Sequence, residues 1–512
     1  MERILNYSYR GLLKSCNYSC SYCPFSKRSS DASVLQADRE ALMRFCCYIS
    51  KLEASPHSLQ ILLLPYGEGM LHPHYTEALS YLSSLPSVRR VSCQTNLSWN
   101  IDQVANAVLQ SGGRLSHISF WCSFHPQCTS PTDFLYQCNR LDHYGIRYCV
   151  GMVARPGSES LAREIRNALS GHTYFWLNRM DGLQRPYTPA EIACFSELDP
   201  FFPLELNSHL SDLSTCQGGK TALFVQADGR TALCPIAGKF SGNIYHRSIS
   251  TSSLSCKAKH CHCYLAYSNR TEIGLKTFFG QGAFLRIPER IGIKNLFLDI
   301  DGTLTGPNGN LLPGIEKTLS LLAGSVNLYF ATALPYSYVQ RKYRKLFPLF
   351  TGGIFAGGAH IRFFRSFPEH YFYLSPTSVR EIRLLLSEYS CSPSTIRRYN
   401  TPEGTYRITI KSKYADTLFH RLSSIKDILI FQEKGLVTII SKATDKGKAL
   451  AYLLRLTKSS RDSAAAIGND ISDIPMFKEV KYPLSVPHSA EPVQHSALCS
   501  MPVTLLPVFF GM

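Results

Sequence analysis

Short apolar runs and amphipathic helical periods alternate along the first part of the 512-residue chain, and this alternation limits the folds open to it. Runs of strand length, separated by helical segments, lie at 4–13, 59–64, 89–93, 117–122, 147–153 and 173–177. Strands joined by helices pair in parallel, because each helix carries the chain back to the same end of the sheet. We therefore predict an α/β fold with a parallel sheet, in barrel or open form.

Polar and metal-binding side chains follow several of these strands. The run Cys16-x3-Cys20-x2-Cys23, with Tyr22 before its last cysteine, comes after the first strand. Gly67-Glu68-Gly69 follows the second strand, and Thr95-Asn96 follows the third. Functional groups of parallel α/β folds gather at the carboxyl ends of the strands, so we expect these side chains to meet in one site. His125, after the fourth strand, is a further candidate for a substrate contact.

The spacing of the first three cysteines favours a metal site with one open position. Three thiolates on one loop can hold three irons of a [4Fe–4S] cluster and leave the fourth iron for a small molecule. A closed zinc site is the alternative, but it needs a fourth protein ligand. The next cysteine or histidine is Cys46, which is separated from the loop by helical residues.

Together these motifs resemble the signature of radical S-adenosylmethionine (SAM) enzymes. The resemblance implies a partial (β/α)6 TIM-like barrel over residues 1–205, in which Cys16, Cys20 and Cys23 bind a [4Fe–4S] cluster and SAM chelates its fourth iron. It also implies reductive cleavage of SAM to a 5′-deoxyadenosyl radical that abstracts hydrogen, and an electron donor such as flavodoxin or ferredoxin. The residues that would contact the cofactor are Tyr22, Gly67, Glu68, Gly69, Thr95 and Asn96, with Met152-Val153 near the adenine.

A second group of cysteines lies within residues 206–265. Its members are Cys216, Cys234, Cys256, Cys261 and Cys263. The first two flank a predicted hairpin with strands at 221–226 and 230–233. The segment resembles the SPASM/twitch extension of radical SAM enzymes, which implies one auxiliary [4Fe–4S] cluster held by four of the five thiolates. A zinc ribbon is the alternative. Residues 266–290 are predicted to form a linker.

The second half of the chain begins with a pair of aspartates after an apolar strand. Asp299 and Asp301 fall on the same side of that strand, so one carboxylate can attack phosphorus while the other protonates the leaving oxygen. This pair resembles the first motif of the haloacid dehalogenase (HAD) superfamily. The resemblance implies a Cof-like phosphatase with a Rossmann-like core at 291–355 and 437–512 and an inserted α/β cap of type C2 at 356–436.

The same resemblance implies roles for residues further along the chain. The implied catalytic residues are Asp299, Asp301, Thr332 and Lys446, and the implied ligands of a Mg²⁺ ion are Asp299, Asp301, Asn469, Asp470 and Asp473. Two positions depart from the family pattern. Asn469 stands where the family carries aspartate, and Ala333-Leu334 follows Thr332 where C2-capped phosphatases often carry Gly-Arg. A HAD-like domain that only binds is therefore the alternative.

Charge and composition restrict the partners. The net charge of +17 and the isoelectric point near 9.1 suit an anionic, phosphorylated small-molecule substrate. Without a dense basic run we do not expect nucleic acid as a partner. There is no apolar run of about 18 residues and no secretion signal, so we predict a soluble cytoplasmic protein without a membrane partner. In that compartment, the 18 cysteines favour metal binding or buried thiols over disulfides.

The predicted function is that of a bifunctional enzyme. A radical SAM half would modify a substrate by hydrogen abstraction, and a HAD half would hydrolyse a phosphate monoester through an aspartyl-phosphate. The alternative is a radical SAM enzyme that modifies peptides or proteins and whose HAD domain is a binding or weakly active module. A third hypothesis is a non-catalytic binding protein stabilised by metal.

Overall fold

The computed structural model describes residues 4–23, 29–207, 209–240, 242–246, 256–289, 291–365, 367–388, 395–433 and 435–512. The chain divides into two compact units, Met1–Glu289 and Arg290–Phe510, which we call unit 1 and unit 2. Each is described by itself. In the described residues, no helix is long and apolar enough to cross a bilayer.

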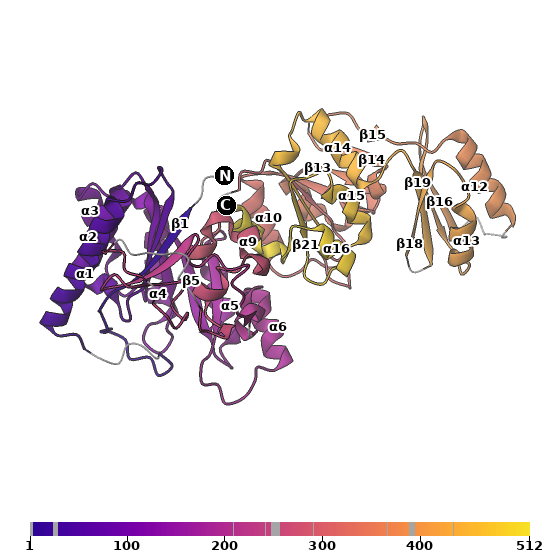
Figure 1. The fold of residues 1–512 in the computed structure, drawn as a ribbon. Coiled ribbons are helices and arrows are strands. Elements are labelled where there is room, and N and C mark those ends of the chain that lie inside the picture. Colours follow the sequence, from indigo (N-terminus) through magenta and orange to yellow (C-terminus); the bar gives the residue numbers. More distant parts are fainter. Residues whose placement is uncertain are drawn as a thin grey trace. The chain divides into compact units, whose positions relative to one another are not determined.

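Unit 1, coloured from indigo to magenta in Figure 1, is built on an eight-stranded sheet. Its strand order is β6-β5-β4-β3-β2-β1-β8-β9. Neighbouring strands from β6 to β8 are parallel, and β9 is antiparallel to β8. The strands are β1 (Leu5–Arg10), β2 (Leu59–Leu63), β3 (Val88–Thr95), β4 (Ile118–Ser123), β5 (Arg147–Ala154), β6 (Tyr174–Arg179), β8 (Ala222–Gln226) and β9 (Thr231–Ala232). The predicted α/β class with a parallel sheet is confirmed, and the sheet is open because β6 and β9 are its edges.

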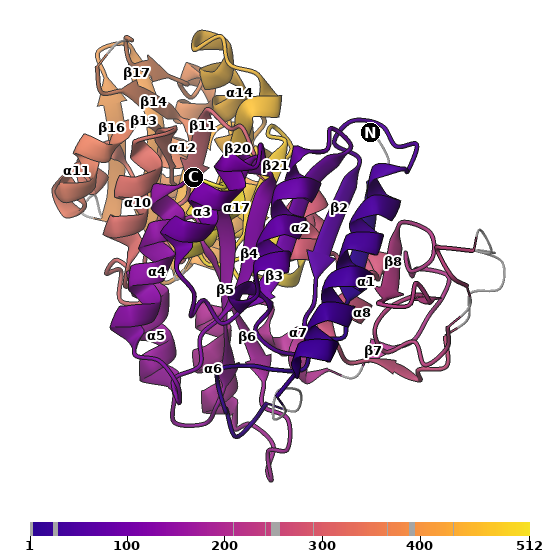
Figure 2. The ribbon, with the colours of Figure 1, turned by 90° about the vertical axis from the view of Figure 1, so that its left-hand side faces the viewer.

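Helices cover one face of this sheet, as Figure 2 shows for the row that begins with α1 and α2. They are α1 (Ala32–Ser50), α2 (Pro73–Ser84), α3 (Ile101–Gln110), α4 (Pro131–His143) and α5 (Glu159–Ala168). Leu42, Phe45 and Ile49 of α1 recur at helical spacing and are fully buried. Phe45 stacks on Tyr9 of β1, with ring centroids 4.5 Å apart. One hydrophobic core therefore joins these helices to residues on one face of β1 to β6.

The opposite face of the sheet is partly polar, and the last residues of unit 1 pack against it. This segment contains α8 (Tyr264–Tyr267), α9 (Leu275–Phe279) and the 3-10 helix η5 (Gly280–Leu285). Gln60 Nε2 on β2 donates to the Gln281 carbonyl at 2.9 Å, and Arg147 on β5 donates to the Pro288 carbonyl. The structure thus corrects the prediction of a linker at 266–290, because residues up to Glu289 are a packed part of unit 1.

Arg286 is the buried centre of this packing, with only 2% of its surface exposed. Its guanidinium lies over the rings of Tyr264, Trp176 and Trp121, at 3.7, 4.3 and 4.9 Å from their centroids. It also pairs at 2.8 Å with Glu205, which lies in α7 (Phe202–Leu206) and is itself buried. Aromatic faces and a carboxylate together offset the cost of removing this cation from water.

Unit 2 contains a second eight-stranded sheet, in the order β15-β14-β13-β12-β11-β20-β21-β22. Neighbouring strands from β13 to β22 are parallel, whereas β14 and β15 are antiparallel. The strands are β11 (Asn295–Leu298), β12 (Asn327–Ala331), β13 (Phe350–Phe355), β14 (His360–Phe363), β15 (His370–Tyr371), β20 (Ala464–Gly468), β21 (Tyr482–Ser485) and β22 (Cys499–Ser500). The main helices are α10 (Ile315–Ala323), α11 (Tyr336–Lys342), α14 (Lys446–Leu456), α15 (Ile474–Phe477), α16 (Glu491–Ser496) and α17 (Leu506–Phe510).

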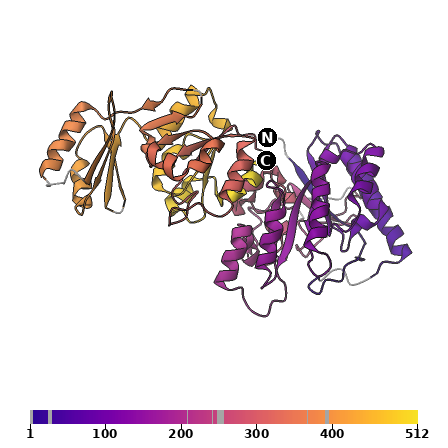
Figure 3. The same cartoon turned by 180° about the vertical axis from the view of Figure 1, so that it is seen from behind.

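A four-stranded antiparallel sheet is inserted into unit 2, in the order β16-β17-β19-β18. It consists of β16 (Ile396–Thr401), β17 (Gly404–Lys411), β18 (Ile428–Glu433) and β19 (Leu436–Ser441), with α12 (Pro376–Glu388) and α13 (Ala415–Leu422) on one face (Figure 3). An inserted α/β layer was predicted at 356–436. In the structure β14 and β15 pair with the main sheet and β19 with the inserted sheet, so both boundaries lie later in the chain than predicted.

Replacing Arg286 by alanine is expected to destabilise unit 1 by about 3–5 kcal/mol, because Glu205 would stay buried without a partner. All three tryptophans lie in unit 1, so urea unfolding followed by tryptophan fluorescence reports this unit. Arg230→Ala is the matched control, since the Arg230–Asp228 pair is 52% exposed on both sides and should change stability by less than about 1 kcal/mol. Equal losses in both variants would contradict the assignment.

Candidate functional site

A cavity of about 240 Å³ opens at the carboxyl ends of the parallel strands of unit 1. Among its lining residues are seven of those predicted from the sequence: Cys16, Tyr22, Cys23, Gly67, Glu68, Thr95 and Asn96. His125, Met152 and Val153 also line it, whereas Cys20 and Gly69 are not among the lining residues. The cavity therefore brings together side chains that follow β1, β2, β3 and β4 and belong to β5, as parallel pairing requires.

Glu68 ties the ends of β2 and β3 together. Its carboxylate is 1% exposed and accepts hydrogen bonds from the Met70 amide at 3.1 Å, the Thr95 hydroxyl at 2.8 Å and the Asn96 amide at 2.5 Å. Burial raises the pKa of Glu68 to about 7, although these three donors act in the opposite direction. The carboxylate of Glu68 thus fixes Thr95 and Asn96, which line the cavity beside it.

Gly67 is required by the crossing of two loops. A Cβ atom at this position would lie 1.6 Å from the Ser15 carbonyl oxygen, and the neighbouring Glu68 amide donates to that same oxygen at 3.0 Å. The base of the cysteine loop therefore rests directly on the Gly67 backbone, which only glycine permits. Gly69 is equally confined, because its Cβ would lie 2.7 Å from the Tyr75 ring.

The cysteine loop is held by contacts to the ends of β3 and β4. Asn96 Nδ2 donates to Asn17 Oδ1 at 3.0 Å and lies 3.6 Å from the Cys16 sulfur. The Ser21 amide donates to Gln127 Oε1 at 2.9 Å. The Tyr22 hydroxyl lies 3.1 Å from Nδ1 of His125. Burial lowers the pKa of His125 to about 4, so its imidazole is neutral at neutral pH.

Cys128 is a neighbour of this loop that sequence reasoning missed. Its sulfur lies 3.6 Å from the sulfur of Cys20. Burial and this contact raise the pKa of Cys20 to about 12. The signal that could have found Cys128 is its place after β4, beside His125, in the same row of strand ends as the other site residues.

The second group of cysteines also converges. Cys216 precedes β8 and Cys234 follows β9, so both lie near one end of this hairpin. Burial raises the pKa of Cys234 to about 12, and the nearby thiols of Cys263, Cys256 and Cys216 act in the same direction. Cys261 lies 3.7 Å from the guanidinium of Arg270, a second residue that the sequence reasoning missed.

In both groups the described cysteines lie near one another but are not arranged as the ligands of one metal ion. Across the described residues, no three His, Cys, Asp or Glu side chains are close enough together to hold a metal ion. In the first group Cys16 and Cys23 face the cavity, while Cys20 faces Cys128. Binding of a cluster would thus require the thiols to turn toward one another.

The site in unit 2 centres on a buried lysine between two carboxylates. Lys446, the first residue of α14, places its Nζ 2.7 Å from Asp299 Oδ1 and 2.6 Å from Asp473 Oδ1. Burial disfavours the Lys446 charge, but Asp299 and Asp473 outweigh it and raise the lysine pKa. Burial, reinforced by Asp473, raises the pKa of Asp299 to about 7.

The other predicted residues of unit 2 differ in burial and in whether they point into this site. Thr332 directly follows β12, the neighbour of β11, and is buried. Asp301 is exposed two residues after Asp299. Asp470, predicted as a metal ligand, is exposed, and its carboxylate caps the following turn by accepting from the Ser472 amide at 2.9 Å. The aspartate that enters the site from this loop is Asp473.

Asn469 lies against oxygens of Asp299 and Asp301 that would face a cation. In the orientation that satisfies its amide group, the NH2 donates to Asp299 Oδ2 at 3.1 Å, to the Asp301 carbonyl at 2.9 Å and to the Thr303 hydroxyl at 3.1 Å. Gly302 makes room for it with a φ of +77°, since a Cβ there would lie 2.2 Å from the Asn469 amide. A neutral amide thus joins oxygens of two residues, Asp299 and Asp301, that the resemblance assigns to Mg²⁺.

Gly67→Ala is expected to displace the cysteine loop, because the added methyl group would overlap the Ser15 carbonyl. Cys16 and Cys23 should then react several-fold faster in a short pulse of iodoacetamide, measured by peptide mass spectrometry. Gly112→Asn is the control, since Gly112 has a φ of +74°, which asparagine tolerates, and no atom within 4 Å of its Cβ position. Unchanged labelling of the Gly67 variant would refute this account of the loop.

Comparison with known proteins bears on unit 2. Residues 403–504 match the family of haloacid dehalogenase-like hydrolases. Among solved structures, the chain is similar to a haloacid dehalogenase-like hydrolase from Bacteroides thetaiotaomicron (18% identity, TM-score 0.34, 40% of this chain and 92% of that one). It is also similar to one from B. subtilis (15% identity, TM-score 0.36, 40% of this chain and 93% of that one). No curated protein matches the chain. The C-terminal part of the chain carries a HAD-like hydrolase domain.

Proposed function

We propose that the chain is a bifunctional enzyme whose unit 2 hydrolyses a phosphate monoester and whose unit 1 is a radical SAM centre. The observation that carries the first assignment is the buried Asp299–Lys446–Asp473 triad at the end of a parallel strand, within a HAD-like hydrolase. A carboxylate that is fixed at a strand end and paired with a lysine is positioned to act as a nucleophile.

The chemistry of unit 2 can be followed through its own residues. An oxygen of Asp299 attacks phosphorus while Asp301, exposed two residues on, gives its proton to the leaving alcohol oxygen. Asp301 then takes a proton from the water that hydrolyses the aspartyl-phosphate. Lys446 offsets charge between Asp299 and the phosphoryl oxygens, and the hydroxyl of Thr332 holds the phosphoryl group from β12.

The oxygens around Asn469 fit a Mg²⁺ ion with reduced charge. If the amide turns its carbonyl inward, that oxygen lies 3.1 Å from Asp299 Oδ2 and 2.9 Å from the Asp301 carbonyl oxygen. Adjacent ligands of an octahedral ion with bonds near 2.1 Å are separated by about 3.0 Å. When bound, Mg²⁺ would offset negative charge on the phosphoryl group. Asn469 contributes no charge, so binding should be weak.

Asn469→Asp is expected to tighten Mg²⁺ binding about tenfold or more, because it adds a charged oxygen ligand. Titration calorimetry on the full chain measures this, and Asp470→Asn is the control, since that carboxylate caps a turn instead. Phosphate release from a panel of sugar and nucleotide phosphates should rise in the Asn469 variant and vanish in Asp299→Asn. Release that survives loss of Asp299 would refute the phosphatase assignment. If only the Asn469 variant turns over, unit 2 of the natural chain is a binding or weakly active module.

The assignment of unit 1 is supported by the cavity that Cys16, Cys23, Tyr22, Glu68, Thr95 and Asn96 share. The donor types fit a [4Fe–4S] cluster, because all three cysteines are on one loop and two face the cavity. Such a cluster would supply the electron for cleavage of SAM, drawn from a donor such as flavodoxin or ferredoxin. Gly67 lets the backbone approach closely, and Glu68 keeps Thr95 and Asn96 facing the cavity. Four of the five later cysteines would hold the auxiliary cluster.

Anaerobic reconstitution is expected to yield about eight irons per chain, the content of two [4Fe–4S] clusters. Cys23→Ala should hold about four irons and release no 5′-deoxyadenosine when SAM and a reductant are added. Cys47→Ala, at an exposed cysteine outside both groups, should behave like the natural chain. Bound zinc without iron would refute the radical assignment and favour a metal-stabilised binding protein.

A further inference from the structure

Arg407 of the inserted sheet is a buried cation that the chemistry described so far does not use. It lies in β17, where it pairs with Tyr399 of β16, and only 5% of its surface is exposed. Its guanidinium lies 5.4 Å from the centre of the Tyr399 ring. Nη2 is 3.4 Å from the Thr438 hydroxyl, and the buried Nε has no hydrogen-bond partner among the described residues.

Arg407 also has no counter-ion among the residues that the structure describes. Burial lowers its pKa, and the groups that oppose this effect are the rings of Tyr399 and Tyr406, not a carboxylate. Two other buried cations among the described residues are paired, since Arg286 contacts Glu205 and Lys446 contacts Asp299 and Asp473. A buried guanidinium without an anion is costly, and an anionic ligand would remove that cost.

The position of Arg407 connects it to the site of unit 2. Nη1 donates to the main-chain oxygen of Ala333, the residue after Thr332. The site itself is rich in negative charge, because Asp299 and Asp473 both pair with Lys446 and Asp301 follows two residues after Asp299. A phosphate monoester would add between one and two further charges. A further cation beside the loop that contains Thr332 would offset this added negative charge.

We infer that Arg407 is a binding residue for the anionic substrate of unit 2, presented by the inserted sheet to the loop after β12. Its guanidinium fork would exchange the Ala333 carbonyl for oxygens of the phosphate monoester, with Nε as an additional donor. This inference rests on the proposed hydrolysis of phosphate monoesters. Arg407 would supply, from the inserted sheet, a positive charge that the Ala333-Leu334 sequence does not provide.

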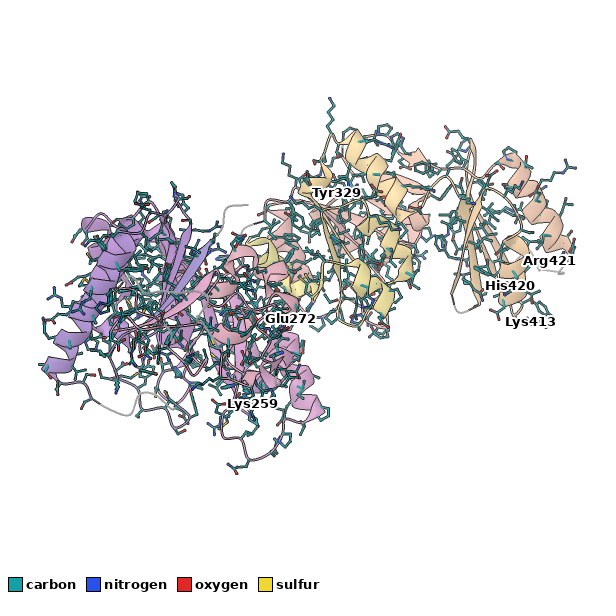
Figure 4. All side chains as sticks on the ribbon, in the orientation of Figure 1. Lys259, Glu272, Tyr329, Lys413, His420 and Arg421 are labelled. Carbon is teal, nitrogen blue, oxygen red and sulfur yellow. The ribbon has the colours of Figure 1, made fainter. Side chains whose placement is uncertain are left out.

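The test compares Arg407→Met with Arg421→Met in the full chain. Arg421 lies in α13 of the same inserted layer, is 56% exposed, pairs with Glu388 and is labelled in Figure 4. The probe is inorganic phosphate, titrated by calorimetry in the presence of Mg²⁺. We expect about tenfold to hundredfold weaker phosphate binding in the Arg407 variant and no change in the Arg421 variant. Arg407→Lys should restore part of the affinity, because it keeps the charge and loses the fork.

Thermal unfolding separates binding from a structural role. Removal of an unpaired buried cation should leave the melting temperature unchanged or higher, whereas loss of a structural arginine would lower it. A lower melting temperature with unchanged phosphate affinity would overturn the inference. A natural chain that binds no phosphate would overturn both the inference and the proposed hydrolysis, while equal affinity in natural and Arg407→Met chains would overturn the inference alone.

Discussion

Parallel strand pairing is the constraint on which both sites of this protein depend. In unit 1, β1 to β6 are neighbours in sequence order, so the residues after each strand arrive at one edge of the sheet. In unit 2, β11 lies between β12 and β20, which brings the residue after β12 and the loop after β20 toward Asp299. Helices on the faces of the sheet make this pairing possible, and the strand ends remain available for polar groups.

Buried charges then determine how well each site is held. Glu68 accepts three internal hydrogen bonds and fixes the wall of the cavity in unit 1. Lys446 joins two carboxylates that would otherwise repel each other across the site in unit 2. Arg286 is enclosed by aromatic rings and a carboxylate, which makes it structural. Arg407 differs from these groups because no described carboxylate balances it, which is why we infer that it receives an anionic ligand.

An anionic substrate would suit both of the proposed chemistries. The cavity of unit 1 is lined by Arg10 and Arg179, and the proposed phosphoryl site of unit 2 would combine Lys446 with Arg407. Both arrangements suit a phosphorylated small molecule that is modified in one unit and loses its phosphate in the other. In the proposed mechanism, the uncharged amide of Asn469 would hold Mg²⁺ more weakly than a carboxylate and would slow hydrolysis.

The sequence by itself determined the alternation of strands and helices, the aspartates after β11, and the polar groups after β2 and β3. These are local patterns, in which side-chain periodicity and strand ends are written in consecutive residues. Only the tertiary structure decided that Cys128 lies against Cys20, that residues 264–289 close the second face of the sheet, that Asp473 rather than Asp470 meets Lys446, and that Arg407 reaches Ala333. Each of these joins residues through the packing of separate elements, and contacts of that kind leave no periodic signal in the chain.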